Sequence, residues 1–95
     1  MTDDERWLVI DGRRWRRTDP ALPEDVVEAL KSHLGQARSA VRQAKRSGDD
    51  AAMRRARDRV QVAKTGLGER GPEWWDVAEA DRLLQARDAL DQLAE

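Results

Sequence analysis

All four aromatic residues of the chain are tryptophans, and they form two clusters on either side of a long alanine-rich stretch. Trp7 and Trp15 lie near the start, whereas Trp74 and Trp75 lie in the last third. The chain has no Phe and no Tyr, so its largest apolar side chains lie outside that stretch. Because an alanine-rich interface between helices buries little apolar area, we expect the tryptophans to complete the core or to bind a partner.

Two segments between these clusters have apolar residues at spacings of three and four, the pattern of an amphipathic helix. We expect helices over residues 23–47 and 50–66, and the short link between them predicts an antiparallel pair. The expected apolar positions are Val27, Leu30, Leu34, Ala37, Val41 and Ala44 in the first helix, and Met53, Ala56, Val60, Ala63 and Leu67 in or just after the second.

A third helix is expected over residues 77–93, with Asp76 or a neighbour as its N-terminal cap. Its apolar positions are Ala80, Leu83, Leu84, Ala86, Leu90 and Leu93. Residues 72–95 carry a net charge of −5, whereas residues 31–71 carry +7. Because opposite charges attract, we expect this acidic helix to cover the basic helical pair, either of its own chain or of a second copy.

Asp11 and Gly12 separate two strand-like runs, which predicts a β-hairpin over residues 6–17. A two-residue loop pairs Trp7 with Arg16 and Leu8 with Trp15. We expect one face to bury against a helix and the other to stack guanidinium groups on an indole. The first face carries Leu8, Ile10 and Trp15, and the second carries Trp7, Val9, Arg14 and Arg16.

These elements predict a mainly α (α+β) fold with a single domain over residues 1–95. The N-terminal two-stranded β-hairpin is expected to pack on an antiparallel two-helix hairpin, to which the C-terminal third helix is added. No apolar run approaches the roughly 18 residues of a membrane span, and the acidic start differs from a secretory signal. The chain also has no cysteine, so we expect a cytoplasmic protein without disulfides.

Two strings resemble a family of small uncharacterised actinobacterial proteins. They are WLVIDGRRWR at residues 7–16 and LGERGPEWW at residues 67–75. Asp19 and Pro20, Pro23, and Ala63 with Lys64 also fit the resemblance, which covers about residues 7–75 and is generic in the helices. It implies no particular activity.

The sequence offers no group of residues suited to catalysis. His33 is the only histidine, and no carboxylate lies three or four positions from it on the helix. Residues 66–71 match the letters G-x-G-x-x-G but follow a helix, which is typical of a helix C-cap and turn. Asp49 and Asp50, together with Glu69, could in principle hold a cation, but two adjacent acidic residues at the start of a helix are more typical of a helix cap. We therefore expect no enzyme activity, no cofactor, no bound metal and no small-molecule substrate.

The remaining expectation is a non-catalytic interaction module that binds a protein partner or a second copy through Trp and Arg side chains and the acidic helix. The alternative is a nucleic-acid-binding accessory protein that uses the Arg-rich and Trp-containing hairpin and the basic helical pair. A pI of about 5.9 is low for such a protein.

We expect at least one of Trp74 and Trp75 to fold back onto the helices. The candidate binding surface comprises Trp7, Arg13, Arg14, Trp15, Arg16, Arg17, Arg70, Trp74 and Trp75.

Overall fold

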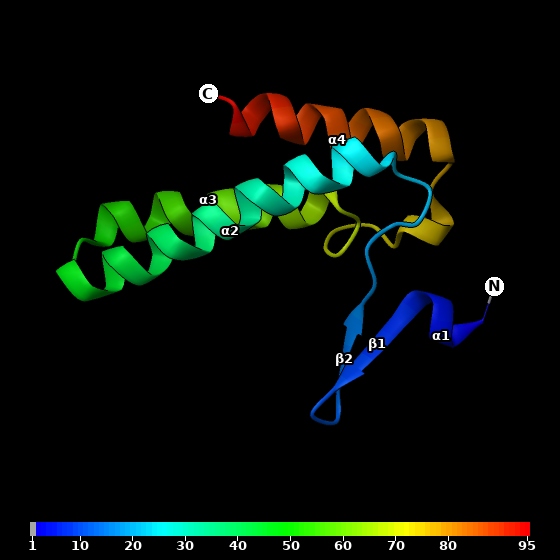
Figure 1. The fold of residues 1–95 in the computed structure, drawn as a ribbon, viewed down its shortest axis with the longest axis horizontal. Helices are drawn as coiled ribbons and strands as arrows, with labels where there is room; N and C mark the ends of the chain where they lie inside the picture. The colour runs from blue at the N-terminus through cyan, green and yellow to red at the C-terminus, as the bar shows by residue number, and fades with distance from the viewer. Residues whose placement is uncertain (1) are drawn as a thin grey trace.

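Two long helices, α2 (Glu24–Ser47) and α3 (Asp50–Gly66), lie side by side as an antiparallel pair (Figure 1). The computed structural model describes residues 2–95. Both helices match the predicted bounds to within one residue. Gly48 ends α2 with a φ of 70°, a conformation that costs glycine no strain. The Asp49 side chain then caps α3 by accepting a hydrogen bond of 3.0 Å from the backbone nitrogen of Ala52.

The third long helix, α4 (Glu79–Leu93), packs mainly on α3 and less on α2. It begins two residues later than predicted, and Asp76 does not cap it, because residues Trp74–Asp76 form the short 3-10 helix η1. The predicted buried face was also wrong in part, since Ala80 is exposed and Leu84 is 67% exposed. The face that α4 does bury carries Arg82, Ala86, Ala89 and Leu93.

The hydrophobic core lies at one end of the helical pair, where α4 and the loop after α3 cover it. Its members are Leu22, Val26, Leu30, Leu34, Ala63, Leu67, Ala86, Ala89 and Leu93. Trp74 is also buried, at 2% exposure. Val26 takes the buried position predicted for Val27, and the predicted seam residues Val41, Met53 and Val60 are only half-buried. Toward the far end of the pair the buried seam residues are alanines, Ala37, Ala44 and Ala56.

The N-terminal segment contains a single turn of helix, α1 (Asp3–Arg6), followed by a β-hairpin of β1 (Trp7–Ile10) and β2 (Arg13–Arg16). The strand register is the predicted one, and Asp11 and Gly12 have φ values of 53° and 77° at the turn. However, the face expected to bury against a helix stays open, because the hairpin projects from the helices and is held at its base (Figure 1). Leu8, Ile10 and Trp15 are 38%, 50% and 38% exposed.

Candidate interaction surfaces

The two tryptophan pairs that are far apart in the sequence partly come together in the structure. The ring of Trp75 lies 5.5 Å from that of Trp7 and 5.1 Å from that of Trp74, edge to face in both cases. We call Trp7, Trp74 and Trp75 the tryptophan cluster. The guanidinium groups of Arg6 and Arg16 lie 4.9 Å and 5.8 Å from the centre of the Trp75 ring. The cluster therefore joins the hairpin to the loop before α4, and Trp15 is left outside it.

Arg16 fastens the hairpin to the loop that follows α3. Its Nη1 donates to the carbonyl oxygens of Gly68, Gly71 and Pro72 at 3.2, 3.0 and 3.2 Å. Gly68 and Gly71 have φ values of 81° and 78°, which curls this loop around the guanidinium. The G-x-G-x-x-G string thus presents backbone carbonyls to an arginine of its own chain. Arg17 is also engaged locally, since its Nε donates to the carbonyl oxygens of Asp4 and Trp7.

Sequence reasoning missed a buried ion pair that ties three segments together. Nε of Arg82 lies 2.9 Å from Oδ2 of Asp19, and the two side chains are 10% and 2% exposed. Nη1 of Arg82 donates to the carbonyl oxygen of Trp74 at 2.7 Å, and Trp74 Nε1 donates to the carbonyl oxygen of Arg17 at 3.0 Å. One sequence signal could have placed Arg82 on the buried face of its helix. Arg82 precedes Ala86, Ala89 and Leu93 at steps of four, three and four, so all four residues share one face.

One side of the helical pair carries a groove that we call the basic groove, with a volume of about 680 Å³. Its floor includes Val41 of α2 and Val60 of α3. The other lining residues are Arg38, Arg42, Arg57, Asp58, Gln61 and Arg70. Arg70 donates from Nη1 to Oε1 of Gln61 at 2.8 Å. The ion pairs found within residues 2–95 are those of Arg82 with Asp19 and Glu79, so Arg38, Arg42 and Arg57 lie without a carboxylate partner there.

The acidic helix packs on the helical pair, as expected, but it lies away from this groove. Instead α4 lies beside Val62 and Thr65 of α3, and Arg59 of α3 donates from Nη2 to the carbonyl oxygen of Leu93 at 2.7 Å. Close packing decides the position of α4, because a Cβ built on Gly66 would lie only 2.8 Å from Cβ of Ala89. Apolar contact at short range therefore decides which side of the helical pair α4 covers.

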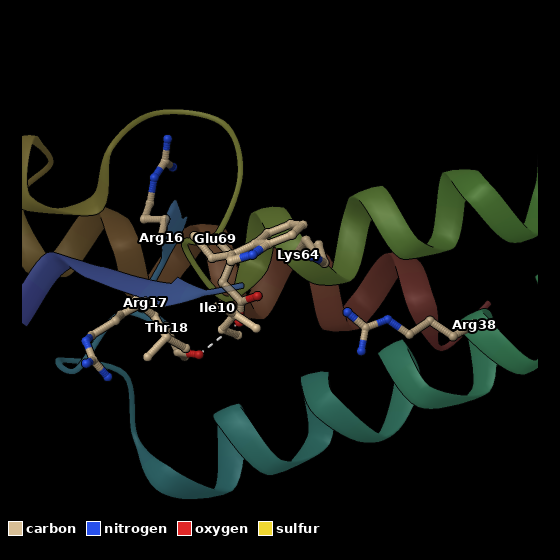
Figure 2. A pocket seen from close by; sticks show the side chains of 9 residues that line it. Ile10, Arg16, Arg17, Thr18, Arg38, Lys64 and Glu69 are labelled. Carbon is tan, nitrogen blue, oxygen red and sulfur yellow. Dashed lines mark hydrogen bonds between the residues drawn. The ribbon is translucent and has the colours of Figure 1, made fainter. Parts of the chain in front are cut away.

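A second groove, which we call the hairpin groove, lies between the β-hairpin and the helices and has a volume of about 520 Å³ (Figure 2). Leu8, Ile10 and Trp15 form its apolar wall. The polar lining residues are Arg16, Arg17, Thr18, Arg38, Lys64 and Glu69. Thr18 donates from Oγ1 to Oε2 of Glu69 at 2.8 Å, as the dashed line in Figure 2 marks. Arg38 lines both grooves, so the two are adjacent on the molecule.

Lys64 is the unusual ionisable group of the hairpin groove. Its side chain is buried at 9% exposure, and Nζ lies 5.5 Å from the centre of the Trp15 ring. Burial lowers the pKa of the Lys64 amine, and the charges of Arg70 and Arg38 lower the pKa further, whereas Glu69 opposes the change. The Lys64 amine makes no hydrogen bond or ion pair with another residue in the described chain.

The other candidate residues have structural surroundings. Arg14 stacks on Trp7 at 4.3 Å, as predicted for that face, and Arg13 stacks on Trp15 at 4.6 Å. His33 is half-buried, and its Nδ1 has no hydrogen-bond partner in the described residues. Residues 2–95 contain no group of three or more His, Asp or Glu side chains placed to hold a metal ion. In the same range, no helix combines the length and apolar character needed to cross a membrane.

Comparison of the chain with models of protein families, with characterised proteins and with solved structures finds no significant match. Its own side chains are therefore the basis for inferring what it does.

Proposed function

We propose that this protein is a non-catalytic interaction module whose basic groove binds an acidic amphipathic helix of a protein partner. The observation that carries the proposal is the set of arginines around an apolar floor, because Arg38, Arg42 and Arg57 find no carboxylate partner within the described chain. A partner helix with carboxylates beside leucines would complement both the charge and the apolar floor.

The shape of the groove supports a helix as the ligand. Its lining residues come from both α2 and α3 and include positions 38, 41 and 42 and positions 57, 60 and 61. These are spacings of three and four along each helix, so the groove follows the line between the two helices. Helices that pack in such a groove approach to about 8–10 Å between axes. A third helix could therefore lie along the pair, as α4 does at another part of its surface.

The structure gives less support to the alternative of nucleic-acid binding. Single-stranded nucleic acids need exposed aromatic rings on which bases can stack. Trp74 is buried, Trp7 and Trp75 pack on each other, and Trp15 already lies under Arg13. The hairpin arginines Arg16 and Arg17 are engaged with backbone carbonyls. Cations remain along α2 and α3, so oligonucleotides belong in the test as a competing ligand.

The test is fluorescence anisotropy with a labelled helical peptide in which leucines at spacings of three and four are flanked by glutamates. A peptide with lysine at every glutamate position is the matched probe. We expect the acidic peptide to bind and the basic peptide not to bind. The double variant Arg42→Glu/Arg57→Glu should weaken binding by more than about tenfold, since a like charge replaces each favourable one. Arg46→Glu/Arg87→Glu makes the same change in net charge at exposed positions outside both grooves and should bind as the native chain does.

Three other outcomes would change this interpretation. Equal weakening by the two double variants would show that net charge alone attracts the peptide, which would contradict a defined groove. Tighter binding of a mixed-sequence oligonucleotide than of the acidic peptide would favour the alternative function. Sedimentation equilibrium of the protein alone reports a second copy as occupant, because α4 itself is an acidic helix with Leu84 exposed. A dimer that Arg42→Glu/Arg57→Glu dissociates would replace the separate partner by self-association.

A further inference from the structure

The hairpin groove has a feature that peptide binding in the basic groove does not use, namely an amine with no partner. Lys64 projects from α3 beneath the hairpin, and its Nζ faces the ring of Trp15 at 5.5 Å. The groove is partly open, and Lys64 is one of the residues that line it (Figure 2). The two other lysines of the chain, Lys31 and Lys45, are exposed on α2.

The charged groups around Lys64 come from every element that borders the groove. Arg38 lies on α2, Glu69 and Arg70 follow α3, and Arg16 and Arg17 belong to the hairpin segment. Most of these already have partners. Arg16 is bound to carbonyl oxygens of the loop, Arg17 to those of Asp4 and Trp7, Arg70 to Gln61, and Glu69 to Thr18. Arg38 is left, and Figure 2 shows it reaching from α2 into the same space as Lys64 and Ile10.

From this arrangement we infer that the hairpin groove is a modification site, in which the Lys64 amine reacts with a small aldehyde that carries a phosphate or carboxylate and an apolar or aromatic body. Trp15, Leu8 and Ile10 offer the wall against which such a body packs. Arg38 meets its anionic group. The unprotonated amine is the nucleophile, and the lowered pKa of Lys64 increases the share of that form near neutral pH.

The reaction balances without a further reactant. The nitrogen lone pair of Lys64 attacks the carbonyl carbon, and the carbonyl oxygen gains a proton to give a carbinolamine. The proton on that oxygen comes from the amine, and loss of the hydroxyl group with the one remaining amine hydrogen, as water, leaves a C=N double bond, an imine. The imine hydrolyses by the reverse path, so the modification is reversible and follows the concentration of the aldehyde.

The test uses pyridoxal 5′-phosphate as the probe, with pyridoxal as the matched aldehyde that lacks the phosphate. The native protein is treated with each at neutral pH, the imine is fixed with cyanoborohydride, and the adduct on each lysine is quantified by peptide mass spectrometry. The α-amine, which reacts with aldehydes in any chain, is quantified separately. We expect about fivefold more adduct on Lys64 than on Lys31 or Lys45, because each unit by which a pKa is lowered raises the unprotonated share up to tenfold.

Two variants separate the site from general amine reactivity. Arg38→Gln should reduce the Lys64 adduct severalfold with pyridoxal 5′-phosphate and leave the pyridoxal adduct unchanged, whereas Arg46→Gln should change neither. Circular dichroism checks that both variants fold. Equal labelling of the three lysines, or equal loss with both aldehydes in Arg38→Gln, would overturn the proposal. Neither outcome bears on the peptide test, in which Arg42 and Arg57 are changed.

Discussion

Arg82 is the residue at which a charge contributes most to the fold. It sits on the buried face of α4, contacts the Asp19 carboxylate and bonds the carbonyl oxygen of Trp74. Removing it leaves the Asp19 carboxylate buried without its cation. Arg82→Met should therefore lower the free energy of unfolding by about 3–5 kcal/mol, as measured by urea denaturation.

Glu79→Gln is the control for that prediction. Glu79 also lies near Arg82, at 3.7 Å, but its side chain is 80% exposed. Water screens such a pair, so this variant should change stability by less than about 1 kcal/mol. If Arg82→Met were no more destabilising than Glu79→Gln, the buried pair would not hold the segments together.

Lys64 is expected to reduce stability at neutral pH, because folding removes a charged amine from water. The folded chain lowers the pKa of Lys64 below its ordinary value of 10.5, so between the two pKa values the unfolded chain binds more protons. Stability from this group therefore rises as pH increases through that window. Lys64→Met should be more stable than the native chain at pH 7, and the difference should shrink by pH 10. Lys45 is exposed, so the control variant Lys45→Met should show no such pH dependence.

At the scale of elements, the helix bounds were predictable because their signals are local. Gly48 and Asp49 end one helix and begin the next, and Asp11 with Gly12 fixes the register of the hairpin. The orientation of the elements was not predictable in the same way. Arg16 donates hydrogen bonds to carbonyl oxygens far along the chain, and Gly71, for example, lies 55 residues after it. No short-range sequence pattern encodes such a pairing.

Two glycines in helices allow a paired test of how α4 is positioned. A Cβ at Gly66 of α3 would lie 2.8 Å from Ala89 Cβ and 3.0 Å from Leu30 Cδ2, and the Ala89 methyl has no rotamer by which to move away. Gly66→Ala should therefore lower stability by about 1–3 kcal/mol. Gly35 of α2 has no atom within 4 Å of such a Cβ, so Gly35→Ala should raise stability by about 0.5–1 kcal/mol through helix propensity. Thermal unfolding measures both, and a shift of the same sign in both would contradict close packing at Gly66.

The hairpin is held at its base, so its own stability should depend on Arg16 more than on Trp15. Arg16→Met removes three hydrogen bonds to carbonyl oxygens and should lower the free energy of hairpin opening by about 1–3 kcal/mol. Trp15→Ala removes a ring that is 38% exposed and lies outside the tryptophan cluster, so its effect should be smaller. Hydrogen exchange of the paired β1 and β2 amides measures this opening. Faster exchange in Trp15→Ala than in Arg16→Met would mean that the open face holds the hairpin.

At the scale of the whole molecule, the candidate site was predictable only in its chemistry. Arginine and tryptophan were expected to form the binding surface, but the tryptophan cluster, Arg16 and Arg17 are used to assemble the fold. The unpartnered cations lie instead on α2 and α3, because packing around Gly66 places α4 elsewhere. Charge totals show that a basic segment and an acidic segment exist, but the packing of small side chains decides where they meet.

The molecule is extended, and this should make its stability uneven along its length. Its radius of gyration is 14.2 Å, compared with about 12.4 Å for a compact domain of this size. The contact of Arg59 with Leu93 marks how far the end of α4 reaches along α3. Beyond it, toward the α2–α3 turn, the buried residues Ala44 and Ala56 hold the two helices together, and alanine buries little apolar area.

We therefore expect native-state hydrogen exchange to divide the helical pair into two parts. Amides around Leu30 and Ala63, which belong to the core, should exchange only on global unfolding. Amides within residues 42–57 should exchange through a partial opening of lower free energy. Because that opening exposes less surface than global unfolding does, their exchange rates should depend less on urea than those of the core amides. If both sets exchanged with the same free energy and the same urea dependence, the helical pair would unfold as one unit and the alanine seam would be as strong as the core. Binding of the acidic peptide in the basic groove should slow exchange in this outer part most, because Arg42 and Arg57 lie there and a ligand stabilises the state to which it binds.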